Sequence, residues 1–149
     1  LYLIEDSCQA IGAKRAFDNQ WDYGNMIRNA GNFGDIGCFS FYPAKILGSL
    51  GDAGAITTNR EDVYNYIKEA RNHFKGTNHE FGGNYRMDNL QVAWLNIRLK
   101  YIDEILARRK EIAERYLREL RELEYQGLIK LPNNQRLRSW QDFIIQVLE

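Results

Sequence analysis

The stretch from Gly37 to Gly54 constrains this chain more than any other part of the sequence. An apolar run with one hydroxyl, Ser40, leads into a bend at Pro43, and a single lysine, Lys45, follows that bend. Proline and the nearby glycines tighten the chain here, so that apolar neighbours can strip the lysine of water. Desolvation disfavours the ammonium form and makes the free amine a usable nucleophile. The alternative is a lysine that extends its charged end into solvent beside an ordinary turn.

A carboxylate follows the first strand-like segment. Residues 1–5 form a short apolar run, Asp6 comes directly after it, and Gln9 stands three positions further on. Open α/β sheets bind ligands at the carboxyl ends of their strands, which favours Asp6 as a ligand contact. If a helical turn follows the strand, Asp6 and Gln9 face the same side. A second interpretation leaves Asp6 as a cap of that turn.

The next elements alternate between strands and helices. Strands are predicted over residues 36–41 and 55–58, and a helix over residues 60–73 with Asn59 as its N-cap. Residues 14–34 show no steady period, which indicates a hairpin or an excursion outside the core. This order of elements predicts an α/β fold.

A long helix is predicted next, because neither glycine nor proline occurs between Met87 and Gln126. Asp88 is its expected N-cap, and Gln91 stands at the capping-box position. Gly127 ends the helix, and a last strand is expected over residues 143–148. Apolar residues follow one face of the helix: Leu90, Trp94, Ile97, Tyr101, Ile105, Ile112, Tyr116, Leu120 and Leu123. Such a face can join two domains or pair with a partner helix.

Composition excludes several classes of function. Twenty basic and twenty acidic residues cancel, with a pI near 6.9, which leaves no electrostatic footprint for nucleic acid. No apolar run is long enough to cross a bilayer. Cys8 and Cys38 form no Cys-x-x-Cys pair, and with only two histidines no metal site is expected. We therefore expect a protein of the reducing cytoplasm, and the start at Leu1 suggests a piece of a longer chain.

Four motifs in order resemble the DegT/DnrJ/StrS sugar aminotransferases, which are fold-type I enzymes that depend on pyridoxal phosphate. Ile4-Glu5-Asp6-Ser7-Cys8-Gln9-Ala10 looks like the strand that carries the acid contacting the pyridine ring. Gly34–Lys45 looks like the segment with the cofactor-binding lysine, and Gly51-Asp52-Ala53-Gly54-Ala55 is similar to the glycine-rich segment that follows. Gly83-Asn84-Tyr85-Arg86-Met87 resembles the loop before the long helix.

The resemblance implies a role for each matching residue. Lys45 would bind the cofactor covalently and then move the proton between substrate and cofactor. Asp6 would pair with the pyridine nitrogen, and Gln9 would contact the oxygen at position 3 of the ring. Ser40 would donate to the cofactor phosphate. Asn84 would reach the phosphate held by a neighbouring subunit, which implies a homodimer with shared sites.

The resemblance also implies the domain organisation. Residues 1–87 would be the second half of a three-layer, cofactor-binding large domain, with a mixed, mainly parallel sheet and helices on both faces. Residues 88–125 would be the connecting helix, and residues 126–149 would open a small α+β C-terminal domain.

The implied reaction is transfer of an amino group, expected from L-glutamate, to a nucleotide-linked keto sugar in amino-sugar biosynthesis. One alternative is a sugar dehydratase of the same family, which commonly has histidine in place of the lysine and is therefore disfavoured by Lys45. Another is a non-catalytic regulatory or interaction protein that uses the long helix as its partner surface. A binding protein would have no chemical need for the five site residues together.

Overall fold

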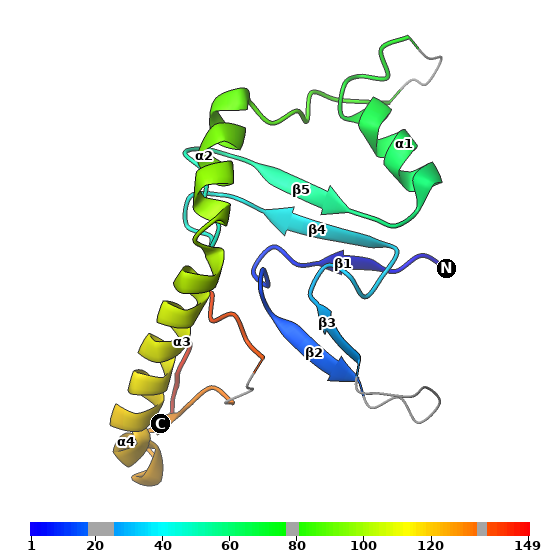
Figure 1. Cartoon of the computed structure of the whole chain (residues 1–149). Coiled ribbons are helices and arrows are strands. Elements are labelled where there is room, and N and C mark those ends of the chain that lie inside the picture. Colours follow the sequence, from blue (N-terminus) through cyan, green and yellow to red (C-terminus); the bar gives the residue numbers. More distant parts are fainter. Residues whose placement is uncertain (18–25, 77–80, 134–136) are drawn as a thin grey trace.

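The centre of the fold is a three-stranded mixed sheet (Figure 1). The computed structural model describes residues 1–17, 26–76, 81–133 and 137–149. Strand β1 (Ile4–Asp6) pairs in parallel with β4 (Ile36–Ser40), and β5 (Gly54–Thr57) lies antiparallel on the other side of β4. The predicted α/β class is confirmed, although one of the two strand pairs described here is antiparallel.

The segment over residues 14–34 contains the predicted hairpin. Strand β2 (Lys14–Phe17) pairs antiparallel with β3 (Met26–Asn29) in a sheet of its own, and the residues between them lie outside the described ranges. The backbone N–H of Lys14 donates to the carbonyl of Leu137 at 2.9 Å, so the hairpin is tied to the C-terminal part of the chain.

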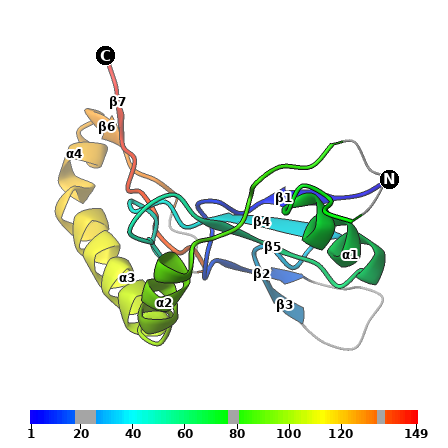
Figure 2. The ribbon, with the colours of Figure 1, turned by 90° about the horizontal axis from the view of Figure 1, so that it is seen from above.

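The helices stand at the two ends of the sheet (Figures 1 and 2). Helix α1 (Glu61–Ala70) follows β5 and lies where β4 begins, whereas α2 (Asn89–Leu99) and α3 (Ile102–Glu119) lie at the end where β4 stops. Short α4 (Arg121–Tyr125) precedes a pair of two-residue strands, β6 (Ile129–Lys130) and β7 (Gln146–Val147). Among the described residues, no helix has both the length and the apolar character that a bilayer crossing requires.

The predicted long helix is divided rather than continuous. At Lys100 and Tyr101 the backbone N–H groups bond to carbonyls three residues back, and α3 starts afresh at Ile102 along nearly the same line (Figure 1). An aromatic and a β-branched residue in succession weaken helix propensity at this point. Leu120 separates α3 from α4, and Gly127, with φ of 73°, follows α4 as expected for a helix end. The division into domains at residues 87 and 126 stays a prediction.

The predicted N-cap at Asn59 and the predicted capping box at Gln91 are wrong, whereas the N-cap position of Asp88 is confirmed. The N-cap of α1 is Arg60 and not Asn59, since the hydroxyl oxygen of Thr58 already accepts the N–H of Arg60 at 3.1 Å. Asp88 is the N-cap residue of α2, but its side chain makes no capping bond. The Gln91 side chain accepts the N–H of Leu50 at 2.8 Å instead of completing a capping box. A long-range contact has taken the place of the local one.

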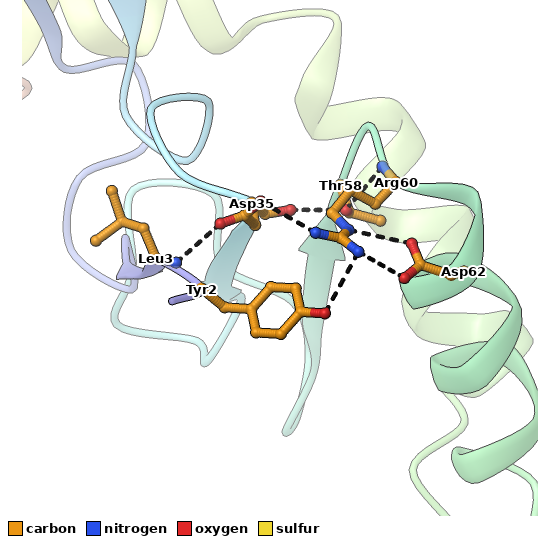
Figure 3. A network of polar contacts seen from close by, with 6 residues as sticks. All are labelled: Tyr2, Leu3, Asp35, Thr58, Arg60 and Asp62. Atoms are coloured by element: carbon orange, nitrogen blue, oxygen red, sulfur yellow. Dashed lines mark hydrogen bonds and ion pairs between the residues drawn. The ribbon is translucent and has the colours of Figure 1, made fainter.

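A polar network ties the start of the chain to the entry of α1 (Figure 3). The Asp35 carboxylate accepts the N–H of Leu3 at 2.9 Å and lies 3.7 Å from the guanidinium of Arg60. Arg60 also pairs with Asp62 at 2.7 Å and lies 4.6 Å from the ring centroid of Tyr2. These contacts are partly exposed, so they fix the geometry of the sheet end more than they stabilise it.

A separate apolar core joins α3 to the C-terminal segment. It consists of Ala113, Leu117, Ile129, Leu131 and Trp140, with Leu120 and Phe143 packed against it. Most of the predicted apolar face of the long helix lies elsewhere and is exposed; Leu90, for example, keeps 68% of its accessible surface. The C-terminal segment is therefore held to the helix by Ala113 and Leu117, which the helical period did not select, together with Tyr116 and Leu120 from the predicted face.

Glu5 organises the turn before β4. Its carboxylate accepts the backbone N–H groups of Gly31, Phe33 and Gly34, and the bonds from Gly31 and Gly34 measure 2.9 and 2.7 Å. Burial alone would raise the pKa of Glu5, but the bonds from Gly34, Gly31 and Phe33 outweigh it and lower the pKa. Glu5 thus supplies the hydrogen-bond acceptor for three backbone N–H groups of the turn over residues 31–34.

Replacing Glu5 by glutamine is expected to lower the free energy of unfolding of the full-length protein at neutral pH by about 2–3 kcal/mol. Because folding lowers the pKa of Glu5, its contribution is complete above the unfolded value and is lost as the pH falls through the folded value. Urea unfolding between pH 3 and pH 7, about the range in which a carboxyl titrates, should show a shallower acid dependence for the variant. Glu114→Gln, at an exposed position of α3, is the matched control and should leave both quantities unchanged.

Candidate functional site

Asp6 and Ser40 lie on one face of the sheet, at the carboxyl ends of neighbouring strands. In the parallel register Asp6 stands opposite Cys38, and Ser40 follows two positions later on the same strand. Side chains two residues apart in a strand share a face, and directly paired residues do too. The structure therefore brings these two predicted site residues to the edge of the sheet where α/β proteins bind ligands.

Lys45 follows Ser40 through a tight turn. The N–H of Lys45 donates to the carbonyl of Tyr42 at 2.8 Å, and the N–H of Tyr42 points to the hydroxyl oxygen of Ser40 at 3.3 Å. A Cβ at Gly48 would lie 2.3 Å from the carbonyl oxygen of Pro43, so only glycine allows the chain to fold back this closely. Lys45 is half-buried.

We call residues 41–51 the Lys45 loop, and side chains of α2 hold its second half. The indole N–H of Trp94 donates to the carbonyl of Gly48 at 3.1 Å, and Arg98 donates to the carbonyl of Ile46 at 3.3 Å. Gln91 accepts the N–H of Leu50, as described above. Within the loop, the hydroxyl of Ser49 donates to the carbonyl of Phe41 at 2.7 Å. The backbone of the loop is thus held both by side chains of a helix and by a hydroxyl of its own.

Gln141, from the C-terminal segment, holds the first half of the Lys45 loop. Its side-chain oxygen accepts the N–H of Ile46, and its side-chain N–H donates to the carbonyl of Ala44, both at 3.0 Å. The sequence did not predict this contact or those of Gln91, Trp94 and Arg98 with the loop. The local sequence pattern around Gln141 does not predict a contact with a loop more than ninety positions away.

The charges of the site act on one another. The thiol of Cys8 and the N–H of Cys8, the latter at 3.1 Å, bond to the Asp6 carboxylate and lower its pKa. The Lys45 ammonium lowers the pKa of Asp6 further, against the opposing effect of desolvation. The same carboxylate raises the pKa of the Cys8 thiol. Asp6 is therefore an anion at neutral pH that lies within electrostatic reach of Lys45.

The bond from Cys8 to Asp6 is the capping contact that the sequence left open as an alternative. Residues 7–13 form two successive turns rather than a helix, with the N–H of Ala10 bonded to the carbonyl of Ser7 and the N–H of Ala13 to that of Ala10. Gln9 is exposed on the first of these turns and lines an open pocket of about 290 Å³ together with Trp140 and Gln141. The predicted helical turn that would align Gln9 with Asp6 is thus wrong.

Asn84 lies apart from the other predicted site residues. Its backbone forms a bridge to Asn72, just after α1, and its side-chain oxygen accepts a bond from Arg86 at 3.0 Å. Helix α1 lies at the end of the sheet opposite to the Lys45 loop (Figure 1). The structure thus brings Asp6, Ser40 and Lys45 together and leaves Asn84 outside this group.

This arrangement fits a small, planar, phosphorylated cation. Asp6 provides an anion for a protonated ring nitrogen, Ser40 a hydroxyl for a phosphate, and Lys45 an amine for a carbonyl group. Among the described residues, no three histidine, cysteine or carboxylate side chains gather as a metal site would require.

Comparison with known proteins identifies the family of the chain. Residues 1–149 match the DegT/DnrJ/EryC1/StrS aminotransferase family. The chain is 39% identical to the dTDP-3-amino-3,6-dideoxy-alpha-D-galactopyranose transaminase of Aneurinibacillus thermoaerophilus, over 100% of this chain and 39% of the relative. It is 34% identical to the 3-oxo-glucose-6-phosphate:glutamate aminotransferase of Bacillus subtilis, over 99% of this chain and 32% of the relative.

A solved structure shows the same fold. The crystal structure of NtdA from Bacillus subtilis with its bound cofactor PMP superposes with a TM-score of 0.75 at 33% identity, over 99% of this chain and 32% of the other. The chain thus spans about a third of the length of the curated relatives it matches. The resemblance seen in the four sequence motifs is confirmed: the chain belongs to the DegT/DnrJ/EryC1/StrS aminotransferase family.

Proposed function

We propose that the protein containing this chain is a pyridoxal-phosphate-dependent aminotransferase that converts a keto sugar into an amino sugar. The observation that carries the proposal is the meeting of Asp6, Ser40 and Lys45 at the carboxyl ends of β1 and β4. An acid, a hydroxyl and an amine in this arrangement match the three groups of the cofactor that need partners: ring nitrogen, phosphate and aldehyde. Pyridoxal phosphate, when bound, serves as the electron sink for the carbanion at the substrate carbon.

Each residue then has a defined task. The Asp6 carboxylate, kept ionised by its bonds to Cys8 and by Lys45, pairs with the protonated ring nitrogen. Ser40 donates to the phosphate. The Lys45 amine holds the cofactor and then takes and returns the proton at the substrate carbon, since it is the amine that the Lys45 loop presents beside Asp6. Gln9 contacts the ring oxygen in this proposal, which requires its exposed side chain to turn from the pocket toward Asp6.

The amino donor that we propose is L-glutamate, and the acceptor is a nucleotide-linked keto sugar. The Aneurinibacillus relative is named for a dTDP sugar, whereas the Bacillus relative is named for glutamate and a sugar phosphate. A dehydratase is the less favoured function, because Lys45 occupies the position that the dehydratase branch commonly gives to histidine.

The proposed assembly is a homodimer with shared sites. The supporting observation is that Asn84 lies apart from Asp6, Ser40 and Lys45 within one chain, so that it can serve the cofactor phosphate only in a second subunit. The proposed location is the cytoplasm, consistent with Cys8 and Cys38, which are both free thiols.

Absorbance spectroscopy of the full-length protein tests the reaction. With pyridoxal phosphate bound we expect a visible band that fades when L-glutamate is added and returns when a dTDP-linked 3-keto sugar is added. Recovery with 3-oxo-glucose 6-phosphate in its place would assign the acceptor to the sugar phosphates. A cofactor band that no amino acid changes, in a protein that removes water from the sugar, would contradict the proposal and favour the dehydratase.

A further inference from the structure

The Gln141 side chain fixes both peptide units that flank Lys45. The carbonyl of Ala44 belongs to the peptide unit before Lys45, and the N–H of Ile46 belongs to the unit after it. Because each peptide unit is planar, holding both of them sets the two soft dihedral angles of Lys45. Those angles determine the direction of the Cα–Cβ bond, and hence the volume that the amine can reach. The Gln141 amide, together with the bond from the Lys45 N–H to the Tyr42 carbonyl, therefore constrains the direction of the lysine side chain.

The position of Gln141 is itself set by α3. Arg109 donates to the carbonyls of Trp140 and Gln141, at 3.1 Å each, and the Trp140 ring is buried in the core formed with Ala113 and Leu117. Trp140 has φ of 55°, in the left-handed region that residues other than glycine rarely adopt. Such strain persists only where the surroundings over-determine the conformation, and it is typical of functional sites.

The two halves of the Lys45 loop are thus held by different parts of the chain. Helix α2 holds residues 46–50 through Gln91, Trp94 and Arg98, whereas the described contact with Ala44 comes from the C-terminal segment. The Ile46 backbone is where the two sets meet, since its N–H bonds to Gln141 and its carbonyl to Arg98.

We infer that Gln141 is a positioning residue, which makes the orientation of the Lys45 amine depend on the docking of the C-terminal segment against α3. The inference rests on the proposed function, in which Lys45 carries the cofactor and moves the proton. Without Gln141, the Lys45 loop keeps its anchors on α2 and the bond from the Lys45 N–H to the Tyr42 carbonyl. The peptide unit after Lys45, however, loses the bond of its N–H and can rotate.

The test uses the full-length protein with bound pyridoxal phosphate and the variants Gln141→Leu and Gln141→Asn. Leucine is similar in size but offers neither bond, and asparagine keeps the amide while placing it one methylene short of the loop. We expect the single-turnover reaction with L-glutamate to slow at least about tenfold, because misplacement of a catalytic group by about 1 Å can cost about 100-fold. We also expect the pH midpoint of the cofactor absorbance band to move, which a merely structural role would not do.

Matched controls separate positioning from general destabilisation. Gln146→Leu, at an exposed position of β7, should leave the rate and the pH midpoint as in the unaltered protein. Arg109→Met should reproduce the Gln141→Leu shift in weaker form, since it loosens the carbonyls of Trp140 and Gln141. Arg108→Met, on the same helix but paired only with exposed Glu111 in the described contacts, should not.

The outcomes distinguish the inference from the proposed function. An unaltered protein that forms no cofactor band would overturn the proposed function, and the inference would fall with it. A normal band in the unaltered protein, with the same rate and pH midpoint in both Gln141 variants, would overturn the inference alone. A slowed reaction with a shifted midpoint in the Gln141 variants and not in Gln146→Leu would support it.

Discussion

The Lys45→Ala variant of the full-length protein is expected to lose transamination by a factor of at least about 1,000, the largest effect of any single substitution in this chain. Lys45 would be both the residue that binds the cofactor and the general base, so its removal eliminates two functions at once. The measurement is the single-turnover conversion of L-glutamate to its keto acid, together with the visible spectrum. Cofactor retained through Asp6 and Ser40 should show the spectrum of the free aldehyde.

Lys130→Ala provides the control, because Lys130 is an exposed lysine in β6, remote from the Lys45 loop. It should retain full activity. Lys45→Arg keeps a positive charge beside Asp6 but cannot bind the aldehyde, so it should be as inactive as Lys45→Ala. An active Lys45→Ala variant would show that another amine performs the reaction.

Asp6→Asn is expected to retain much of the cofactor binding but to slow the reaction by about 100- to 1,000-fold, as for removal of one preorganised electrostatic contact. The amide cannot keep the ring nitrogen protonated, which weakens the electron sink. Because Cys8 and Lys45 lower the pKa of Asp6, the unaltered carboxylate stays ionised to a lower pH than usual, and its contribution should disappear only in acid. The rate of the unaltered protein should therefore show no titration of Asp6 near neutral pH.

The matched control for this variant is Asp103→Asn, an exposed carboxylate in the first turn of α3. Single-turnover rates for both variants, with the cofactor at saturation, separate weakened chemistry from weakened binding. If Asp6→Asn reacted at the rate of the unaltered protein, the ring nitrogen would need another partner and the assignment of Asp6 would be wrong.

The elements themselves could be predicted from the sequence. Strands β4 and β5 follow the apolar and β-branched runs near their predicted bounds, and the hairpin lies within residues 14–34. The group of Asp6, Ser40 and Lys45 could also be predicted, because the ends of parallel strands must meet at one edge of a sheet. In each case the information is local, or follows from the rules of sheet topology.

What the sequence could not supply were contacts between distant side chains and backbone groups. Gln91 fits a capping box by spacing, but in the folded chain it bonds to the N–H of Leu50, 41 positions away. Gln141 is the stronger example, since its proposed role depends on the hydrogen bonds of its side chain to two backbone groups beside Lys45. No periodicity or local motif encodes such a contact.

The apolar face of the long helical stretch is a second feature whose packing could not be predicted from the sequence. Its period is clear from Leu90 to Leu123, yet the core of this region is built by Ala113 and Leu117 with Trp140. A helical period shows that a face is apolar, but not which surface covers it. In this chain the C-terminal segment covers only part of that face, at Tyr116 and Leu120.

The most direct test of the central claim is to locate the cofactor on the chain. The full-length protein is incubated with pyridoxal phosphate, reduced with borohydride to make the attachment permanent, digested and examined by mass spectrometry. The account predicts that the added mass lies on Lys45 and that prior incubation with L-glutamate prevents the labelling. Labelling of a different lysine, or of none, would contradict it.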